Sequence, residues 1–340
     1  MPNHGSSMNT TVTEPVEIVV AIVNYCTPDV SIDCLRSLEP ETRRHTGMRV
    51  IVADNASADR SGDAIAEAIE QNGWSAWARL LQLPRNGGFA YGNNAVLREF
   101  QTVATAPRYF WLLNSDTVVL PGATQALIDV LVGDPTIGIV GSCLEDPDGT
   151  QQHSAFRFHT IASELETSAC LGPITRMLGK WAVAPARERK TARYDWVSGA
   201  SMMIRSEVVR DIGLMDESYF LYYEETDYCR KAAAAGWTCV FAAESRIVHL
   251  VGRSTGVTDR TQQARRRSAY WFQSRRRYFV THHGRLYAIA ADAALALGTI
   301  IRRCIAAIRQ RPSETPQRFL LDLIDHSALW RMPAARKERP

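Results

Sequence analysis

An apolar run in the first half of the chain ends abruptly in polar residues. In YFWLLNSDTVV (109–119), Asn114, Ser115 and Asp116 interrupt the apolar residues, which then resume. A carboxylate at the end of a buried strand has two interpretations: it belongs to a turn, or it binds a divalent cation together with phosphate. Because Mg²⁺ and Mn²⁺ need several oxygen ligands, one carboxylate suffices only when a substrate diphosphate supplies further oxygens.

Three other apolar runs also end in small polar residues. Asn24 and Tyr25 follow the first run, Asp54 follows the second, and Asn86 and Gly88 follow the third. Asp54 caps the next helix or accepts a hydrogen bond from the ring N–H of a pyrimidine base. The glycine pair forms a tight turn or lets the backbone approach a ligand, and it lacks the GxGxxG spacing of a dinucleotide site.

A second group of acids lies in the second half of the chain. Glu224, Glu225 and Asp227 fall at the predicted start of a helix, where acids complement the helix dipole. The aromatic residues of SYFLYYEE surround them, which is unusual for a solvated face, so one of the acids is a candidate general base. His249 ends a later apolar strand and is either a core histidine or a neutral metal ligand.

The elements that position these residues alternate regularly through the first half. β-branched apolar runs at 16–25, 48–54, 78–83 and 109–114 are separated by segments with helical patterns. This order predicts an α/β fold, a mostly parallel sheet with helices on both faces. Ligands of such sheets bind beyond the carboxyl ends of the strands, so the four polar strand ends should form one cleft.

The composition then changes near residue 255. Residues 253–285 contain nine arginines and one acid, Asp259. We expect a disordered N-terminus at 1–15, a catalytic domain at 16–256 and an arginine-rich helical extension at 257–340. The apolar stretch 286–301 contains Asp292 and is short for a membrane span, which favours an amphipathic or packing helix.

The arginine-rich segment has two interpretations. Its arginines form a solvated helix face, or they bind an anion, because arginine is suited to phosphate recognition. The interleaved aromatic residues fit a peripheral contact with an anionic membrane surface. No nucleic-acid-binding module is present, and a net charge of +3 does not indicate nucleic acid.

The cysteines and the N-terminal residues indicate a compartment. The seven cysteines are scattered without a CxxC pair, which predicts free thiols in a reducing environment. The first residues lack the apolar core of a signal peptide. We expect a cytoplasmic protein that contacts the inner face of the cytoplasmic membrane peripherally.

The ordered motifs together resemble a known family. They are AIVNY, VIVADNASAD, LPRNGGFAYGNN, FWLLNSDTVV, VSGASMMIRSEVVRDIGLMDESYFLYYEETDYCRKAAAAGW and IVHLVGRSTG. In this order and spacing, residues 16–256 resemble the inverting family 2 glycosyltransferases with the GT-A fold, especially the rhamnosyltransferase-like branch.

The resemblance implies a role for each candidate residue. The implied nucleotide-sugar site consists of Asn24, Tyr25, Asp54, Asn86, Gly88, Asn114, Asp116, Gly199 and Ala200. Glu225 matches the catalytic base, and Glu224 and Asp227 shape the acceptor site or orient the base. Asp116 matches the last acid of an Asp-x-Asp motif that holds Mg²⁺ or Mn²⁺, and His249 matches a histidine of the same shell.

One departure from the family pattern concerns the metal. Asn114 stands where the first acid of Asp-x-Asp would be, which removes a negative charge beside the ion. The asparagine variant is familiar in the rhamnosyltransferase-like branch, so we expect activity to persist with a lower metal affinity, and strict metal dependence stays open.

The implied reaction moves a sugar from a dTDP- or UDP-sugar, with rhamnose from dTDP-rhamnose favoured. The acceptor would be a hydroxyl of a glycan or of a polyprenyl-diphosphate-linked sugar in surface polysaccharide synthesis. The alternatives are a nucleotidyltransferase, a degenerate nucleotide-sugar-binding scaffold and a basic membrane-docking protein. The oligomeric state stays open.

Overall fold

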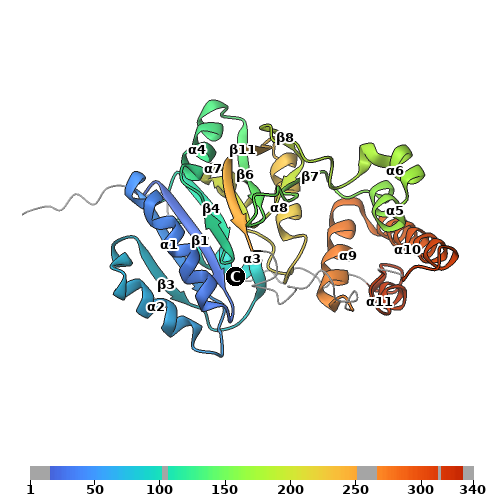
Figure 1. The fold of residues 1–340 in the computed structure, drawn as a ribbon, viewed down its shortest axis with the longest axis horizontal. Coiled ribbons are helices and arrows are strands. Elements are labelled where there is room, and N and C mark those ends of the chain that lie inside the picture. Colours follow the sequence, from blue (N-terminus) through green and yellow to red (C-terminus); the bar gives the residue numbers. More distant parts are fainter. Residues whose placement is uncertain (1–15, 102–105, 251–265, 313–314, 332–340) are drawn as a thin grey trace, which may run out of the picture.

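The computed structural model describes residues 16–101, 106–250, 266–312 and 315–331 (Figure 1). The N-terminal segment 1–15, which we predicted to be disordered, lies outside the described residues. So does the predicted boundary between residues 256 and 257.

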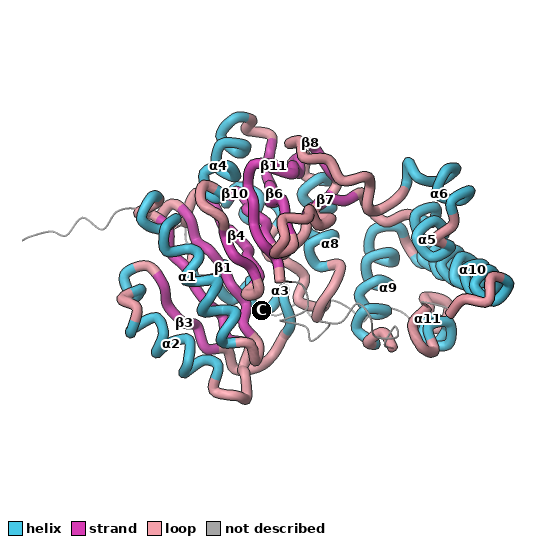
Figure 2. Tube along the Cα trace, in the orientation of Figure 1, coloured by secondary structure: helices cyan, strands magenta, loops and turns pink. Residues whose placement is uncertain are grey.

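A single large sheet forms the centre of the first part of the chain (Figure 2). Its strand order is β3-β2-β1-β4-β10-β6-β11-β5, and β8 (Ala192–Tyr194) pairs with β11. The strands of this path are, in chain order, β1 (Ile18–Asn24), β2 (Met48–Asp54), β3 (Ala78–Gln82), β4 (Tyr109–Asn114), β5 (Thr117–Val119), β6 (Ile137–Glu145), β10 (Ser201–Arg205) and β11 (Thr238–His249).

The predicted parallel order is confirmed for the first half of the sheet. β1 pairs in parallel with both β2 and β4, and β2 pairs in parallel with β3. β6 and β11 are also parallel. The antiparallel strands are β10, which lies between β4 and β6, and β5 and β8, which both pair with β11. The sheet is therefore mixed but mostly parallel.

Helices cover both faces of this sheet, as predicted. One core contains residues of α1 (Pro28–Arg44), α2 (Ser61–Gln71) and α4 (Ala123–Gly133). The other core contains residues of α3 (Gly88–Glu99), α7 (Ser206–Ile212) and α8 (Glu224–Ala234). Along β1, Ile18, Val20 and Ile22 enter the first core and Val19 and Ala21 the second, which explains its continuous apolar run.

A helical module lies beside the sheet (Figure 1). It combines α5 (Ile161–Ala169) and α6 (Gly172–Leu178) with α9 (Ala269–His283), α10 (Arg285–Ile308) and α11 (Phe319–His326). A Cβ at Gly298 of α10 would lie 2.0 Å from Ser168 Oγ and 2.8 Å from the Ala169 nitrogen, so α5 and α10 approach closely. Two short elements, β7 (Ala155–Phe156) and β9 (Trp196–Val197), pair between the sheet and this module.

The predicted helix in the apolar stretch 286–301 is confirmed as a packing helix. Ala288, Ala291, Asp292 and Leu295 of α10 are all buried. Among the described residues, no helix combines the length and apolarity needed to cross a membrane.

The prediction of a solvated arginine face is wrong for α9. Arg275, Arg276 and Arg277 are 2%, 8% and 8% exposed. They bind acids or a carbonyl inside the molecule: Arg277 donates to Asp216, and Arg276 donates to the carbonyl of His326. Arg277 links the helical module to the rest of the chain, whereas Arg275 and Arg276 bind partners within the module, so these three arginines do not supply a surface patch.

Candidate active site

The polar strand ends meet at one edge of the sheet. Asn24 is in register with Asp54 of the neighbouring strand, and Asp54 is in register with Gln82 of the next. On the other side of β1, Val23 is in register with Asn114. The carboxyl ends of β1 to β4 therefore bring the predicted nucleotide-sugar residues together.

Asp54 is fully buried at this edge, and hydrogen bonds hold both oxygens of its carboxylate. Its Oδ1 accepts from Asn24 Nδ2 at 2.7 Å and from the Ser57 hydroxyl at 2.6 Å. Its Oδ2 accepts from the Ser57 N–H at 3.0 Å and from Gln82 Nε2 at 2.7 Å. A pyrimidine N–H could reach this carboxylate only by replacing a donor, and the side-chain amide of Gln82 is the one that can rotate away.

Asn24 is a central residue of the edge, whereas Tyr25 reaches outward. Asn24 is fully buried, and its Oδ1 accepts hydrogen bonds from the hydroxyls of Ser31 at 2.9 Å and Thr27 at 3.2 Å. Tyr25 is 47% exposed. An exposed aromatic ring beside buried polar residues can stack on a flat ligand such as a base.

Gly88, in the turn after β3, lies against Phe220, which belongs to the segment that leads to Glu224 and Glu225. Gly88 has φ +85°, and a Cβ there would lie 1.9 Å from the Phe220 carbonyl oxygen. That carbonyl accepts the N–H of Phe89 at 3.0 Å. Asn86 Oδ1 accepts the N–H of Gly88, and Asn55 Nδ2 donates to the Gly88 carbonyl. Only glycine fits at position 88, because both the conformation and the close approach exclude a side chain.

Asp116 and His249 face each other, although they lie far apart in the sequence. Asp116 is 1% exposed, and its Oδ1 lies 3.4 Å from His249 Nε2. The other ring nitrogen of His249 lies 3.2 Å from Gln152 Oε1, and the Gln152 amide donates to the His249 carbonyl. A histidine whose far nitrogen is oriented in this way is suited to ligate a metal.

This pair fits two ligands of a divalent ion, and further oxygens would be needed. Within the part of the chain that the structure describes, no group of three or more His, Cys, Asp and Glu side chains could hold a metal alone. The backbone of Asn114 binds neighbouring residues. Its N–H donates to the Ala200 carbonyl at 3.0 Å, and its carbonyl accepts from Thr117 Oγ1 at 2.7 Å.

Glu224, which is buried, and Glu225, which is partly buried, form an acidic pair at the start of α8. Glu224 is 3% exposed, and its Oε2 has no hydrogen-bond partner in the structure, nor has Oε2 of Glu225. Burial raises the pKa of Glu224 well above its usual value, and the charge of Glu225 raises it further. Burial also raises the pKa of Glu225, against N–H groups of Gly199 and of its own helix turn that lower it. A carboxylate with a raised pKa is a better proton acceptor.

The segment around Gly199 and Ala200 joins this pair to the metal candidates. A Cβ at Gly199 would lie 3.2 Å from the Phe89 ring and 3.6 Å from Glu225 Cβ. The Gly199 N–H lowers the pKa of the Glu225 carboxyl, and the Ala200 carbonyl accepts the N–H of Asn114. Glu225 is thus connected through two residues of backbone to the strand end that carries Asp116.

Asp227 is engaged differently from its two neighbours. Its Oδ1 lies 2.7 Å from His282 Nε2 and accepts from the Tyr219 hydroxyl at 3.3 Å. Its Oδ2 lies 2.6 Å from Lys231 Nζ. Asp227 is therefore a structural link between α8 and α9.

Several residues of the site carried no signal in the sequence. Gln152 lies in an irregular stretch, yet it orients His249. Gln82 and Ser57 surround Asp54. His282 belongs to the arginine-rich segment, yet it binds Asp227. Only the register of the strands could have indicated Gln82, and no local pattern indicates the others.

The fold and site define an α/β protein with a cluster of buried polar residues at the carboxyl edge of its sheet. Residues 15–277, most of the chain, match the family described as "Glycosyltransferase like family 2". The chain belongs to glycosyltransferase family 2, has the GT-A fold, and is a glycosyltransferase that uses a nucleotide-sugar donor.

A named relative is the N-acetylglucosaminyl-diphospho-decaprenol L-rhamnosyltransferase of Mycobacterium tuberculosis. It is 28% identical over 231 residues, which cover 65% of this chain and 72% of the relative.

Two solved structures share the fold. The mannosyltransferase PcManGT of Pyrobaculum calidifontis, in complex with GDP-Man and Mn²⁺, has a TM-score of 0.54 at 14% identity, over 94% of this chain and 88% of that chain. GalNAc-T7 with UDP, GalNAc and Mn²⁺ has a TM-score of 0.56 at 15% identity, over 93% of this chain and 56% of that chain.

Proposed function

We propose that this protein is an inverting rhamnosyltransferase that transfers rhamnose from dTDP-rhamnose to a sugar hydroxyl of a polyprenyl-diphosphate-linked acceptor. One observation carries the site assignment: backbone contacts through Gly199 and Ala200 connect Glu225 to the strand end of Asn114 and Asp116. The donor and acceptor identities rest on the mycobacterial relative, whose name contains both rhamnose and diphospho-decaprenol.

The donor lies along the carboxyl edge of the sheet in this proposal. The base reaches Asp54 in place of Gln82 and stacks beside Tyr25. Asn24 holds Asp54 in position, and the turn of Asn86 and Gly88 supports the sugar end.

Glu225 acts as the general base. Its carboxylate takes the proton of the acceptor hydroxyl, whose oxygen attacks the anomeric carbon as the bond to the diphosphate breaks. The electron pair of that bond leaves with the nucleoside diphosphate, and the proton stays on Glu225 until it passes to solvent. One displacement inverts the anomeric configuration. The pKa of the neighbouring Glu224 is raised by burial and by the charge of Glu225, which disfavours ionisation of both carboxyls at once.

Asp116 and His249 would hold Mg²⁺ or Mn²⁺ against the donor diphosphate, whose oxygens complete the shell. When bound, the ion supplies positive charge that stabilises the leaving diphosphate. Both structural relatives named above contain Mn²⁺, which supports this choice of cofactor.

A membrane surface is the proposed place of action. The exposed side of α10 carries Leu286, Leu297, Ile300 and Ile308, which are 84%, 52%, 47% and 80% exposed. Residues 293–321 contain five arginines and one acid. Apolar side chains among arginines suit a helix that lies in the interface of an anionic membrane. We also propose that 16–256 forms the catalytic domain and 257–340 its helical extension.

Thermal unfolding in the presence of nucleotides tests the donor site. A ligand that binds only the folded state raises the melting temperature. We expect dTDP to stabilise the protein, Mn²⁺ or Mg²⁺ to strengthen this effect, and Asp116→Ala to abolish the metal contribution. Asp129→Ala, on the exposed face of α4, is the matched control.

A flat response to dTDP and UDP in the presence of metal would overturn the donor assignment. Stabilisation by UDP without dTDP would keep the transferase and replace the donor. Release of dTDP from dTDP-rhamnose in the presence of acceptor then measures the reaction directly.

A further inference from the structure

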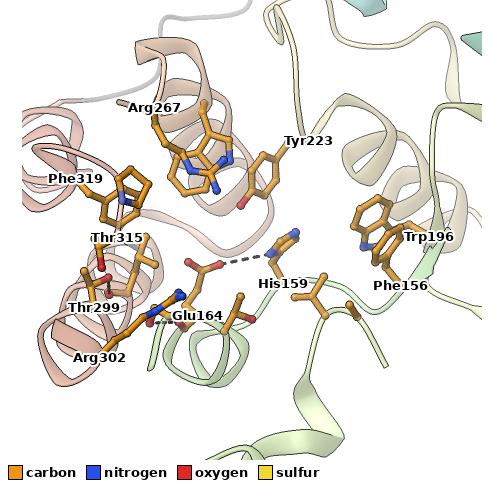
Figure 3. Close-up of a pocket in the computed structure, with 17 residues that line it drawn as sticks. Phe156, His159, Glu164, Trp196, Tyr223, Arg267, Thr299, Arg302, Thr315 and Phe319 are labelled. Atoms are coloured by element: carbon orange, nitrogen blue, oxygen red, sulfur yellow. Dashed lines mark hydrogen bonds and ion pairs between the residues drawn. The ribbon is translucent and has the colours of Figure 1, made fainter. Parts of the chain in front are cut away.

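A cavity of about 400 Å³ lies between the short β7–β9 pair and the helical module (Figure 3). No residue of the donor edge lines it. Its apolar walls come from distant parts of the chain: Phe156, Trp196, Tyr223, Trp271, Leu295 and Phe319. A volume in this range is typical of sites for small molecules.

Two arginines at this cavity give it an anion-binding character. Arg267 lies over the Trp271 ring at 4.7 Å, and Arg302 of α10 approaches from the side of Thr299 and Thr315 (Figure 3). Guanidinium groups match the geometry of diphosphate oxygens, because each can donate two parallel hydrogen bonds.

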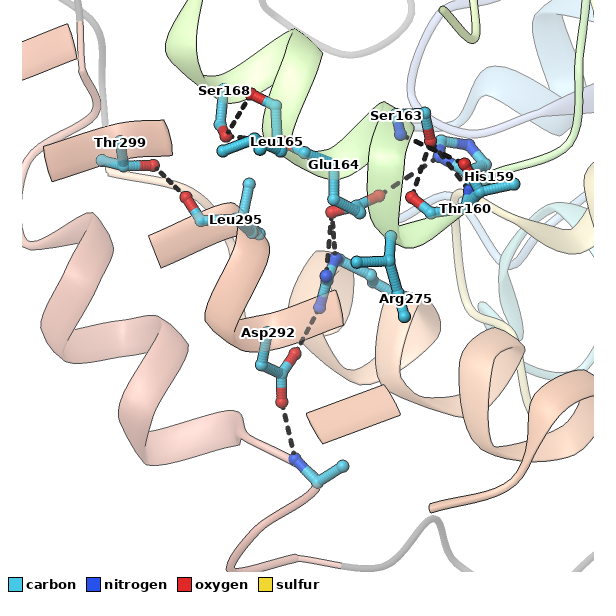
Figure 4. A network of polar contacts seen from close by, with 12 residues as sticks. His159, Thr160, Ser163, Glu164, Leu165, Ser168, Arg275, Asp292, Leu295 and Thr299 are labelled. Carbon is cyan, nitrogen blue, oxygen red and sulfur yellow. Dashed lines mark hydrogen bonds and ion pairs between the residues drawn. The ribbon is translucent and has the colours of Figure 1, made fainter. Parts of the chain in front are cut away.

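The acid inside the cavity is already neutralised. Glu164 accepts from Arg275 at 2.9 Å and lies 3.4 Å from His159 Nδ1 (Figure 4). Burial alone would raise the pKa of Glu164, but the charges and hydrogen bonds of Arg275 and His159 together outweigh it, and the pKa lies below its usual value. The carboxylate therefore stays ionised within an ion pair and does not repel an incoming anion.

The cavity adjoins the catalytic residues. Tyr223, which lines it, is the residue directly before Glu224 and Glu225 and adopts a left-handed conformation with φ +70° at the helix start. Trp196 lines the same side and precedes Gly199 by three residues. A molecule anchored here would present its next group toward the start of α8.

We infer that this cavity binds the prenyl diphosphate part of the acceptor. The diphosphate would lie at Arg267 and Arg302, and the first isoprenoid units would lie against the aromatic walls. The rest of the prenyl chain would leave the cavity beside α10, toward the exposed apolar residues of that helix. This inference rests on the proposed function, since it names the recognition element of the proposed lipid-linked acceptor.

Three probes and three variants test the inference. The probes are farnesyl diphosphate, inorganic diphosphate and farnesol, and isothermal titration calorimetry measures their binding. Arg302→Gln and Arg267→Gln remove the charges, and Ala184→Trp fills the cavity from a loop that lines it. Arg303→Gln, at an exposed neighbouring position on α10, is the matched control.

We expect farnesyl diphosphate to bind the wild type at least tenfold more tightly than either other probe. Each arginine variant should weaken its binding about tenfold, as loss of a charge-assisted hydrogen bond does. Ala184→Trp should abolish it, and Arg303→Gln should leave it unchanged. In transfer assays the same variants should raise the KM for a lipid-linked acceptor while kcat stays within a factor of two.

Equal binding of inorganic diphosphate and farnesyl diphosphate would overturn the inference, because it would indicate an anion site without a lipid site. Competition between dTDP and farnesyl diphosphate would also overturn it, because the probe would then occupy the donor edge. Unchanged binding in all three variants would do the same.

The donor response separates this inference from the proposed function. Stabilisation by dTDP should be equal in the wild type and in the cavity variants. If dTDP stabilises none of them while the cavity still binds farnesyl diphosphate, the proposed donor fails and the lipid site stands.

Discussion

The donor edge of the sheet and the helical module use the same residue types in opposite ways. At the donor edge, Asp54 is bound by Ser57, three residues away, and by groups of the adjacent strands. In the helical module, Arg275 joins Glu164, 111 residues earlier, to Asp292 (Figure 4). Strand register positions the first set, whereas packing of distant helices positions the second.

This difference separates residues that are expected to affect catalysis from residues that are expected to affect stability. The acids near the donor edge include Glu224 and Glu225, whose free oxygens are buried at a cost in folding free energy. In the helical module, Glu164 and Asp292 are both paired with Arg275, and the three residues hold α5, α9 and α10 together. Substitutions in the first region should change catalysis, and substitutions in the second should change folding.

The largest effect is expected at Glu225. Glu225→Gln should lower kcat by about 10²–10⁴-fold, which is the usual contribution of a general base. Its melting temperature at neutral pH should rise, because the variant no longer ionises a buried carboxyl. Transfer assays and thermal unfolding of the same preparation measure both effects. Equal activity of the variant and the wild type would remove Glu225 from the mechanism.

The pH profile follows from the same group. The pKa of Glu225 is raised, so the base is protonated and inactive at low pH, and kcat should rise as the pH increases through the raised pKa. Stability should move in the opposite direction: the unfolded chain ionises this carboxyl at its usual pKa, so the folded state loses stability between the two pKa values. A pH-independent kcat from pH 4 to 8 would contradict this.

The next effect concerns stability and lies in the helical module. Arg275 is 2% exposed, and its removal leaves two buried carboxylates without their partner. Arg275→Leu should therefore cost about 3–5 kcal/mol of unfolding free energy. Denaturant unfolding measures this cost. Arg303→Leu, at an exposed position, should change the stability by no more than about 0.5 kcal/mol.

Acid should weaken the ion pair between Glu164 and Arg275. The pKa of Glu164 lies below its usual value, so the ion pair contributes stability above the usual carboxyl pKa. That stability is lost as the pH falls through the lowered pKa of the folded state. Arg275→Leu should show less of this acid sensitivity than the wild type, and an identical pH dependence would assign it to other groups.

The same contrast explains what the sequence could predict. The parallel order of β1 to β4 and the polar strand ends follow from local patterns of β-branched runs and turns. The short strand β10 was missed, since its five residues enter the middle of the sheet in the antiparallel direction without a distinctive pattern. The buried positions of Arg275 to Arg277 could not be predicted, because their partners lie far away in the sequence and only tertiary packing brings them together.

The smallest effect tests the contact where the two regions meet. His282 of α9 binds Asp227 of α8, two residues after the proposed base. His282→Leu should cost about 1–2 kcal/mol of stability, because Asp227 loses a buried hydrogen bond. His282→Gln keeps a donor at this position and should recover most of that loss.

The effect of His282 on catalysis decides whether the two regions are coupled. If α9 orients the start of α8, His282→Leu should lower kcat several-fold while the KM for the donor stays constant, and His282→Gln should restore kcat. His283→Gln, at the adjacent position, leaves the Asp227 contact intact and should keep the wild-type kcat. A loss of stability without any change in kcat would mean that Asp227 only fastens the helices, and that the donor edge and Glu225 work independently of the module beside them.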